Sequence, residues 1–291
     1  MTARAALWAG RVLWLAVGVA GWIAIGAALD GRSTAGAVCA QIVAWVVFAA
    51  GLVTLIVPSS AGLTVLRMVA PLTPIAAVLT MFGGAGAGRG ASFFGVAVLA
   101  SVQSATGELG RAFVQSSAYG EEDRFPLRPA AGFLLAVTIG WVVWAAVLTT
   151  GTVALCHEVW PLGAVATALA LAGAWPLAVR CHRLSRRWLV VVPAGLVVHD
   201  HLVLAETLLV QRRALVRVGL ALQGTEAADI TGPSGGHRLE IVVRDTVKIA
   251  FAATRRATVG QAIHARSFLV APTRPGRVLA KAADRQLSVR S

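Results

Sequence analysis

The sequence predicts a bundle of transmembrane helices followed by a small cytoplasmic α+β domain, and three observations lead to this prediction. First, the 291 residues are 57% hydrophobic and only 13% charged, with a mean hydropathy of +0.75. Soluble domains carry about 25% charged residues, so this composition excludes a soluble enzyme, a disordered chain and a coiled coil. Second, the first part of the chain contains uncharged stretches long enough to cross a bilayer. Third, short β-branched runs replace these stretches beyond residue 180.

A membrane-spanning helix needs about 17–25 predominantly apolar residues, and six stretches of the sequence meet this requirement. We expect helices near residues 8–29, 35–57, 64–84, 90–106, 131–155 and 159–179. The fourth is the most polar, because Ser101, Gln103, Ser104 and Thr106 lie in its second half. A bundle of five helices is therefore the alternative. The first stretch is longer than the apolar region of a signal peptide, which has about 7–15 residues, so we expect it to remain as a helix.

The arginines near the ends of these stretches predict how the helices are oriented. With the N-terminus inside, ten arginines fall on the cytoplasmic side: Arg4, Arg11, Arg67, Arg111, Arg124, Arg128, Arg180, Arg183, Arg186 and Arg187. Only Arg32 and Arg89 fall on the outer side. Because cytoplasmic loops are enriched in Lys and Arg, we expect a multi-pass protein of a bacterial plasma membrane with both termini in the cytoplasm.

The charge distribution marks a boundary near residue 180. Residues 1–179 hold 8 basic and 6 acidic residues, whereas residues 180–291 hold 18 and 7. We therefore expect a transmembrane domain over residues 1–180, with one cytoplasmic loop at 107–130, and a basic cytoplasmic domain over residues 181–291. We attribute the predominance of arginine over lysine to a GC-rich bacterial genome rather than to selection for phosphate binding, and we expect no nucleic-acid partner.

The C-terminal part has the pattern of short strands closed by a helix. Residues 188–192 and 196–199 are β-branched runs separated by Pro193-Ala194-Gly195, which is typical of a hairpin. Further short strands are expected at residues 202–204, 207–210, 239–243, 247–252 and 264–270. Residues 275–287 read as a helix with Pro275 in its first turn. This order predicts a small β-barrel or sandwich closed by a C-terminal helix, which residues 186–291 would form without the membrane.

One segment, Arg186-Arg187-Trp188-Leu189-Val190-Val191-Val192-Pro193-Ala194-Gly195-Leu196-Val197-Val198, resembles the start of a pleckstrin-homology-like (PH-like) domain of the bacterial membrane-protein type. Its basic residue, aromatic residue and x-P-x-G-L hairpin directly follow the last expected span. The whole layout resembles uncharacterised membrane proteins of high-GC Gram-positive bacteria. The resemblance implies binding of a protein, a peptide or lipid headgroups rather than catalysis, and it carries over no catalytic residue.

Four arginines follow the last expected span and form the first candidate site: Arg180, Arg183, Arg186 and Arg187. Their simplest role is topological, because they hold this end of the chain inside the cell. Basic residues near an anionic leaflet also contribute about 1 kcal/mol each to membrane attraction. We therefore hypothesise that they hold the PH-like domain against anionic headgroups.

The second candidate site lies in the expected loop, where Glu121, Glu122 and Asp123 precede Arg124. Such a cluster is compatible with a solvated loop, with binding of a partner or a metal ion, and with engagement of the basic C-terminal domain. Loops of this length without regular structure are often functional. An enzymatic role remains open only through this loop.

The remaining polar residues favour structural interpretations. His199 and His201 lie two residues apart on a strand and would face the same side, but a metal site needs further ligands. Cys39, Cys156 and Cys181 form no C-x-x-C pair, and free thiols are expected although Cys39 and Cys156 both lie near the outer face. No Walker, H-E-x-x-H or G-x-S-x-G motif occurs. We therefore expect no catalytic residue, no cofactor and no metal ion.

These observations favour a non-enzymatic assembly or regulatory factor whose cytoplasmic domain binds a protein partner or anionic lipid headgroups. Its partners would be membrane lipids and another membrane or cytoplasmic protein. The first alternative is a transporter or permease subunit for an apolar or lipid substrate. Ion-coupled transport is less favoured, because no charged residue lies deep inside an expected span. The second alternative is a membrane enzyme that uses the acidic loop.

Overall fold

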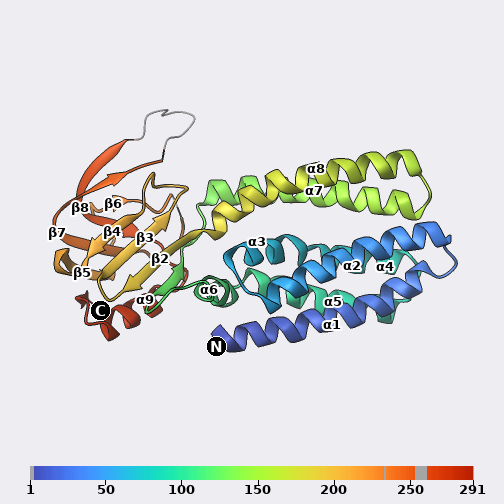
Figure 1. The fold of residues 1–291 in the computed structure, drawn as a ribbon, viewed down its shortest axis with the longest axis horizontal. Helices are drawn as coiled ribbons and strands as arrows, with labels where there is room; N and C mark the ends of the chain where they lie inside the picture. The colour runs from blue at the N-terminus through green and yellow to red at the C-terminus, as the bar shows by residue number, and fades with distance from the viewer. Residues whose placement is uncertain (1–2, 233, 253–260, 291) are drawn as a thin grey trace. The chain divides into compact units, whose positions relative to one another are not determined.

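The structure is a computed structural model that describes residues 3–232, 234–252 and 261–290, and it contains two compact units (Figure 1). The helical unit consists of residues Met1–Phe113 and Val137–His182. The sheet unit consists of residues Val114–Ala136 and Arg183–Ser291. The boundary at His182 lies close to the expected one. However, the sheet unit also takes a segment from the expected loop, so it is not formed by the C-terminal part alone.

The helical unit consists of long apolar helices whose outward faces carry large hydrophobic side chains. Its elements are α1 (Ala3–Leu29), α2 (Thr34–Ile56), α3 (Ser60–Val69), α4 (Leu72–Phe82), α5 (Ala87–Ala105), α7 (Ala131–Cys156) and α8 (Trp160–Ser185). Five spans are long and apolar enough to cross a membrane: Arg4–Leu29, Thr34–Ile56, Ser60–Phe82, Ala131–Cys156 and Trp160–Ser185. The expected span at 90–106 is the helix α5, which does not reach this apolarity.

The low hydropathy of α5 comes from Arg89 and from several polar side chains, two of which bond to neighbouring segments. Gln103 donates from Nε2 to the carbonyl of Ala6 at 3.0 Å, and Ser101 donates from Oγ to the carbonyl of Ala70 at 2.8 Å. Arg67 donates from Nε to the carbonyl of Ser104 at 3.1 Å. These bonds place the end of α5 beside the start of α1, so α5 runs antiparallel to α1 along the unit (Figure 1).

The third expected span is interrupted in its middle. It begins at Ser60, after the N-cap Ser59, and breaks between α3 and α4 at Ala70-Pro71. Pro74 has no backbone N–H to donate to the Ala70 carbonyl four residues before it. That carbonyl accepts instead from the backbone N–H of Thr73 at 3.1 Å and from the hydroxyls of Thr73 and Ser101, each at 2.8 Å. The earlier start corrects one expectation: Arg67 lies about 10 Å along the helix from Ser60, well inside a span rather than at its end.

Glycines allow α1 and α2 to approach closely. The fully buried Trp14 lies against Gly51 and donates from Nε1 to the carbonyl of Phe48 at 2.9 Å. A Cβ atom at Gly51 would lie 2.1 Å from the Trp14 ring, and one at Gly18 would lie 2.5 Å from Phe48. Only glycine fits at these positions without movement of an aromatic ring.

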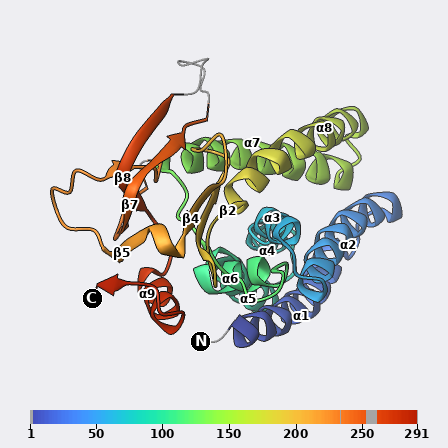
Figure 2. The same ribbon diagram turned by 60° about the vertical axis from the view of Figure 1, so that its left-hand side comes forward.

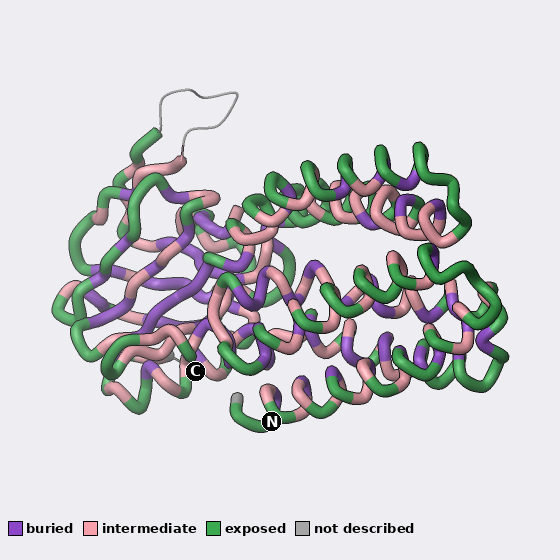
Figure 3. Tube along the Cα trace, turned by 45° about the vertical axis from the view of Figure 1, so that its right-hand side comes forward, coloured by how far each residue is buried: buried purple, intermediate pink, exposed green. Residues whose placement is uncertain are grey.

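The sheet unit contains two sheets and a helix around one core, and Figure 3 shows buried residues gathered in the middle of this unit. The first sheet has the order β1-β2-β3-β4, all antiparallel: β1 (Asp123–Pro126), β2 (Arg187–Val192), β3 (Gly195–Asp200) and β4 (Leu208–Gln211). The second has the order β6-β8-β7-β5-β9: β5 (Leu215–Leu220), β6 (Ala228–Asp229), β7 (Leu239–Ala250), β8 (Ala262–Val270) and β9 (Val289–Arg290). Helix α9 (Pro275–Asp284) packs against β5 and buries Val278 and Ala282 in the core (Figure 2).

The predicted hairpin, the strand near 207–210 and the C-terminal helix are all present, but several details differ. Residues 202 and 203 lie in a turn, and Leu204 forms an isolated bridge with Phe251. The strands β5, β6 and β9 lie where the sequence predicts none. The two strands expected at 239–243 and 247–252 are one strand, β7, with a register shift between Val242 and Val247 against β8. This irregularity coincides with the polar residues that suggested a turn.

A segment of the expected loop provides the strand β1. Phe125 lies opposite Leu189 of β2, and the core of the sheet unit contains the side chains of Phe125 and Leu127. The prediction that residues 107–130 form an irregular loop is therefore wrong for β1. It is also wrong for α6 (Gly107–Gln115), a short helix that directly follows α5. Helices α7 and α8 lie between β1 and β2 in the chain, and β1 and β2 pair with each other. The chain therefore leaves the sheet unit through α7 and returns to it through α8.

Candidate functional site

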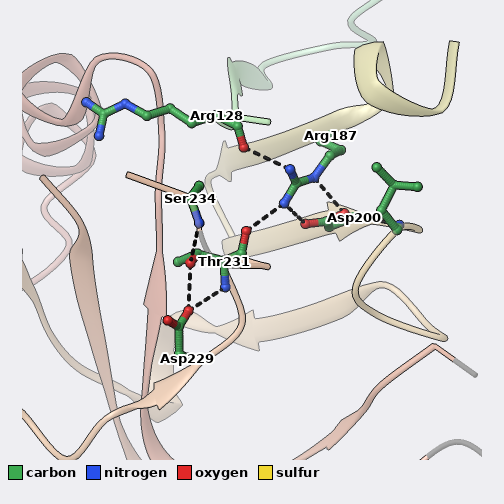
Figure 4. A network of polar contacts seen from close by, with 7 residues as sticks. Arg128, Arg187, Asp200, Asp229, Thr231 and Ser234 are labelled. Atoms are coloured by element: carbon green, nitrogen blue, oxygen red, sulfur yellow. Dashed lines mark hydrogen bonds and ion pairs between the residues drawn. The ribbon is translucent and has the colours of Figure 1, made fainter. Parts of the chain in front are cut away.

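Arg187, one of the four arginines expected to face lipid headgroups, is instead buried inside the sheet unit. Its side chain is 1% exposed and makes a bidentate ion pair with Asp200, Nε to Oδ1 at 2.9 Å and Nη2 to Oδ2 at 2.7 Å (Figure 4). It also donates to the carbonyls of Arg128 at 2.8 Å and Thr231 at 2.9 Å. This guanidinium has no free donor edge for a headgroup, so we remove Arg187 from the candidate site.

The network around Arg187 extends into the loop after β6. Asp229 accepts from the backbone N–H and the hydroxyl of Thr231 at 2.8 and 2.7 Å, and Thr231 in turn accepts from the N–H of Ser234 (Figure 4). The network thus joins β2, β3, the segment before α7 and this loop. A buried pair with satisfied hydrogen bonds fixes a particular arrangement of chain segments more than it adds net stability, so its role here is structural.

The other three arginines of the first candidate site are exposed: Arg180, Arg183 and Arg186. Arg180 belongs to α8 and donates to the carbonyl of Pro176 at 3.0 Å, which is one turn earlier in the same helix. Arg183 and Arg186 present their side chains to the surface. These residues keep the exposure that headgroup binding requires.

The acidic cluster of the second candidate site is engaged by basic residues of the sheet unit. Glu122 pairs with Arg124 at 2.6 Å, and Asp123 pairs with Lys281 at 3.3 Å and Arg285 at 3.0 Å. Arg285 also donates to the carbonyl of Glu121. Of the roles considered for this cluster, the structure shows engagement of the C-terminal region for Asp123. The carboxylates line a polar cavity of about 600 Å³ together with Arg212 and Asp284.

His199 and His201 form part of a stack of side chains on the outer face of the first sheet. The His199 ring stacks on Trp188 with centroids 4.8 Å apart, the His201 ring meets it edge-on at 4.3 Å, and Arg124 lies 5.4 Å from the Trp188 ring. Burial, and then the positive charges of His201, Arg186 and Arg124, lower the pKa of His199 to about 4. No group of three His, Cys, Asp or Glu side chains in the described residues is placed to hold a metal ion.

An exposed basic face lies on the outer side of β7 and β8. Lys248 and His264 are opposite each other in the register of these strands, and Arg266 follows two residues after His264 on the same face. All three are exposed, as are Arg244 and Asp245 near the irregular part of β7. We call Lys248, His264 and Arg266 the hairpin face.

The helical unit contains an apolar cavity of about 790 Å³, which sequence analysis did not anticipate. Residues of α1, α2, α4 and α7 form most of its lining, including Trp22, Trp45 and Leu79. At the end that carries the α1–α2 and α7–α8 connections, the lining includes Arg32 and His157, whose side chains are 3.1 Å apart. Such a space depends on which helices meet, and residue spacing along one helix does not reveal it.

The three cysteines are free thiols in the structure. Cys156 lies at the same end of the helical unit as Gly36, with Sγ 3.6 Å from the Gly36 carbonyl oxygen.

The chain matches no protein-family model, no curated protein and no solved structure.

Proposed function

We propose that this chain is a multi-pass plasma-membrane protein that acts as a non-enzymatic assembly or regulatory factor, and that its sheet unit binds an acidic partner at the cytoplasmic surface. The partner is a protein or the anionic headgroups of membrane lipids. The hairpin face carries this proposal, because two exposed cations and an exposed histidine share one side of β7–β8. The sheet unit as a whole has 19 basic and 10 acidic residues, a net charge of +9.

Two features support six crossings with both termini in the cytoplasm. The end of α5 is bonded to the start of α1, so α5 runs through the helical unit as a span would. The antiparallel pairing of β1 with β2 requires that the segment before α7 and the segment after α8 lie on one side of the membrane. The arginine bias, which is nine to two once Arg67 is left out, supports the proposal that this side is the cytoplasm.

The order of elements supports the resemblance to a PH-like domain. An antiparallel meander β2-β3-β4 is followed by a second sheet, and a C-terminal helix contributes Val278 and Ala282 to the shared core. The strand β1 is an addition to the edge of this arrangement. By analogy of fold this order favours a binding role, although function depends on the site rather than on the fold.

Binding of anionic vesicles by the full chain tests the proposal. The protein in neutral-lipid nanodiscs should float with added vesicles that contain anionic lipid and not with neutral vesicles. Arg266→Gln should weaken this association by about fivefold, since each basic residue near an anionic surface contributes about 1 kcal/mol. Arg213→Gln is the matched control, because it removes one exposed charge outside the hairpin face.

If Arg266→Gln and Arg213→Gln lost vesicle binding equally, only the net charge of the chain would matter. The hairpin face would then be excluded as the binding surface. If the wild-type chain binds no vesicle of either kind, an acidic protein remains as the partner. Crosslinking from solubilised membranes, compared between wild type and Arg266→Gln, would then decide whether this face binds any partner.

A second candidate function is transport of an apolar or lipid substrate. The apolar cavity of the helical unit favours it, and so does the break between α3 and α4, because interrupted spans line substrate sites in many transporters. Substrate-dependent flux in proteoliposomes would test it. An enzymatic role gains nothing from the acidic cluster, since Glu122 and Asp123 are paired with basic side chains.

A further inference from the structure

The cavity of the helical unit has the chemical character of a site for a hydrocarbon chain. Its walls are aromatic and aliphatic, and its volume of about 790 Å³ lies in the range of small-molecule pockets, which is about 300–1,000 Å³. Trp22 and Trp45 contribute to this lining and are 63% and 51% exposed, so the cavity opens on the outward, apolar side of the helices. The molecules that surround such a surface in a membrane are phospholipids.

One end of the cavity is polar and positively charged. Arg32 and His157 line that end, with Nη1 of Arg32 3.1 Å from Nδ1 and 3.3 Å from Nε2 of His157. An imidazole is no counter-ion for a guanidinium. Among the described residues no carboxylate pairs with Arg32, although Asp30 lies two residues before Arg32 and Glu158 directly follows His157 in the sequence. The guanidinium is therefore available to an anion.

We propose that this cavity binds one anionic phospholipid, with its phosphate on Arg32 and a hydrocarbon chain between α1, α2, α4 and α7. A guanidinium binds phosphate through two parallel hydrogen bonds, and His157 lies where it can donate a further one. The cavity behind supplies the apolar surface for the chain. The proposal concerns binding alone; it gives the second candidate function a ligand class, and it holds whether or not the protein moves the lipid.

Two glycines allow a matched test of the chain-binding part. Gly26 lines the cavity, and a Cβ atom added there would meet no heavy atom within 4 Å. Gly95 of α5 has the same open surroundings and does not line the cavity. Gly26→Leu places a side chain in the cavity from a position where the added Cβ meets open space, whereas Gly95→Leu adds the same side chain elsewhere. Both variants should remain folded, as monodispersity and helical circular dichroism would show.

Two arginines allow a matched test of the headgroup part. Arg32 and Arg89 lie in or next to helix connections and are both exposed, but only Arg32 lines the cavity. Arg32→Gln should remove the preference for an anionic headgroup and leave chain binding. Arg89→Gln should change neither.

The measurement is native mass spectrometry of the full chain released from detergent, with phosphatidylglycerol or phosphatidylcholine of the same chain length added. The wild type should retain one phosphatidylglycerol, with an apparent affinity about tenfold above that for phosphatidylcholine. Gly26→Leu should weaken retention of both lipids by about tenfold, which is 1.4 kcal/mol, and Arg32→Gln should equalise the two lipids.

Equal retention by Gly26→Leu and Gly95→Leu would show that lipids bind only as an annular layer, and the proposal would be wrong. Equal retention of both lipids by the wild type would remove the role of Arg32. Lipid binding at the cavity without flux in proteoliposomes would exclude the transport function and leave the lipid site standing. Flux without binding at this cavity would overturn the site and leave transport standing.

Discussion

The Arg187 guanidinium and the Asp200 carboxylate form a two-point ion pair, at 2.9 and 2.7 Å, with both side chains excluded from solvent. The pair connects β2 to β3 opposite each other in register, and its remaining donors bind backbone carbonyls of two other segments. Removal of either partner leaves an uncompensated buried charge, so this pair controls whether the sheet unit assembles.

We predict that Arg187→Gln destabilises the sheet unit strongly. The loss of one member of a buried pair costs about 3–5 kcal/mol, and two backbone carbonyls also lose their donor. Limited proteolysis of the full chain in detergent, followed over temperature, should show cleavage within the sheet unit well below the wild-type transition. Arg186→Gln is the control, because Arg186 is its exposed neighbour and should leave the transition unchanged. If Arg187→Gln resisted proteolysis up to the same temperature as the wild type, the structural role of the pair would be contradicted.

The sheet unit should fold as a soluble fragment only when β1 is present. Phe125 and Leu127 belong to its core, and β1 pairs with the edge of β2 that residues 186–291 alone would expose. Residues 114–136 joined through a flexible linker to residues 183–291 should show mixed α/β circular dichroism and a cooperative melt. Residues 183–291 alone should aggregate. Equal behaviour of the two fragments would show that β1 is dispensable.

Within the linked fragment, Phe125→Ala should reduce the free energy of unfolding by about 3–5 kcal/mol, because it leaves a cavity in the core. Tyr119→Ala is a suitable control, since Tyr119 is 86% exposed. Denaturant unfolding would measure both changes. A small effect of Phe125→Ala would place β1 outside the cooperative core.

The stability of the sheet unit should fall as the pH drops from about 6.5 towards 4. The folded unit lowers the pKa of His199 to about 4, whereas an unfolded histidine titrates near about 6.5. The unfolded chain therefore binds the proton first, and stability is complete above the unfolded value and declines between the two. Thermal unfolding of the full chain at a series of pH values would show this slope.

The variant that tests this assignment is His199→Phe, which keeps an aromatic ring on Trp188 and removes the titration. Its melting temperature should vary less with pH over this range than that of the wild type. His264→Phe, at an exposed position of β8, should retain the slope. If His199→Phe kept the full slope, another group would be responsible.

The topology predicts opposite labelling of two engineered cysteines in a cysteine-free background. Tyr119→Cys lies in the segment that leads into β1, and Arg32→Cys lies in the α1–α2 connection. In intact cells an impermeant thiol reagent should modify only Arg32→Cys, and in inverted membranes only Tyr119→Cys. A reporter that is active in the cytoplasm, fused after Ser291, should be active. Modification of both cysteines from one side would contradict the proposed number of crossings between them.

The sequence by itself determined the properties that depend on local composition and period. Long uncharged stretches have few alternatives to helices that cross a membrane, because an unpaired backbone group is too costly in lipid. Five of the six expected spans meet the length and apolarity of a membrane helix, and the hairpin at Pro193-Ala194-Gly195 and the helix from Pro275 follow from turn chemistry. These features need no knowledge of distant residues.

Tertiary structure alone decided the features that join distant parts of the chain. Arg187 reads as one more basic residue after a span, and only its meeting with Asp200 makes it a buried partner. Asp123–Pro126 has no strand signal of its own and becomes β1 because β2 offers an open edge and the core accepts Phe125. The polar residues near the end of α5 suggested a weak span, yet the side chains of Ser101 and Gln103 bond to other parts of the helical unit. The cavity depends on four helices at once, and pairing across such separations depends on the whole fold rather than on local sequence.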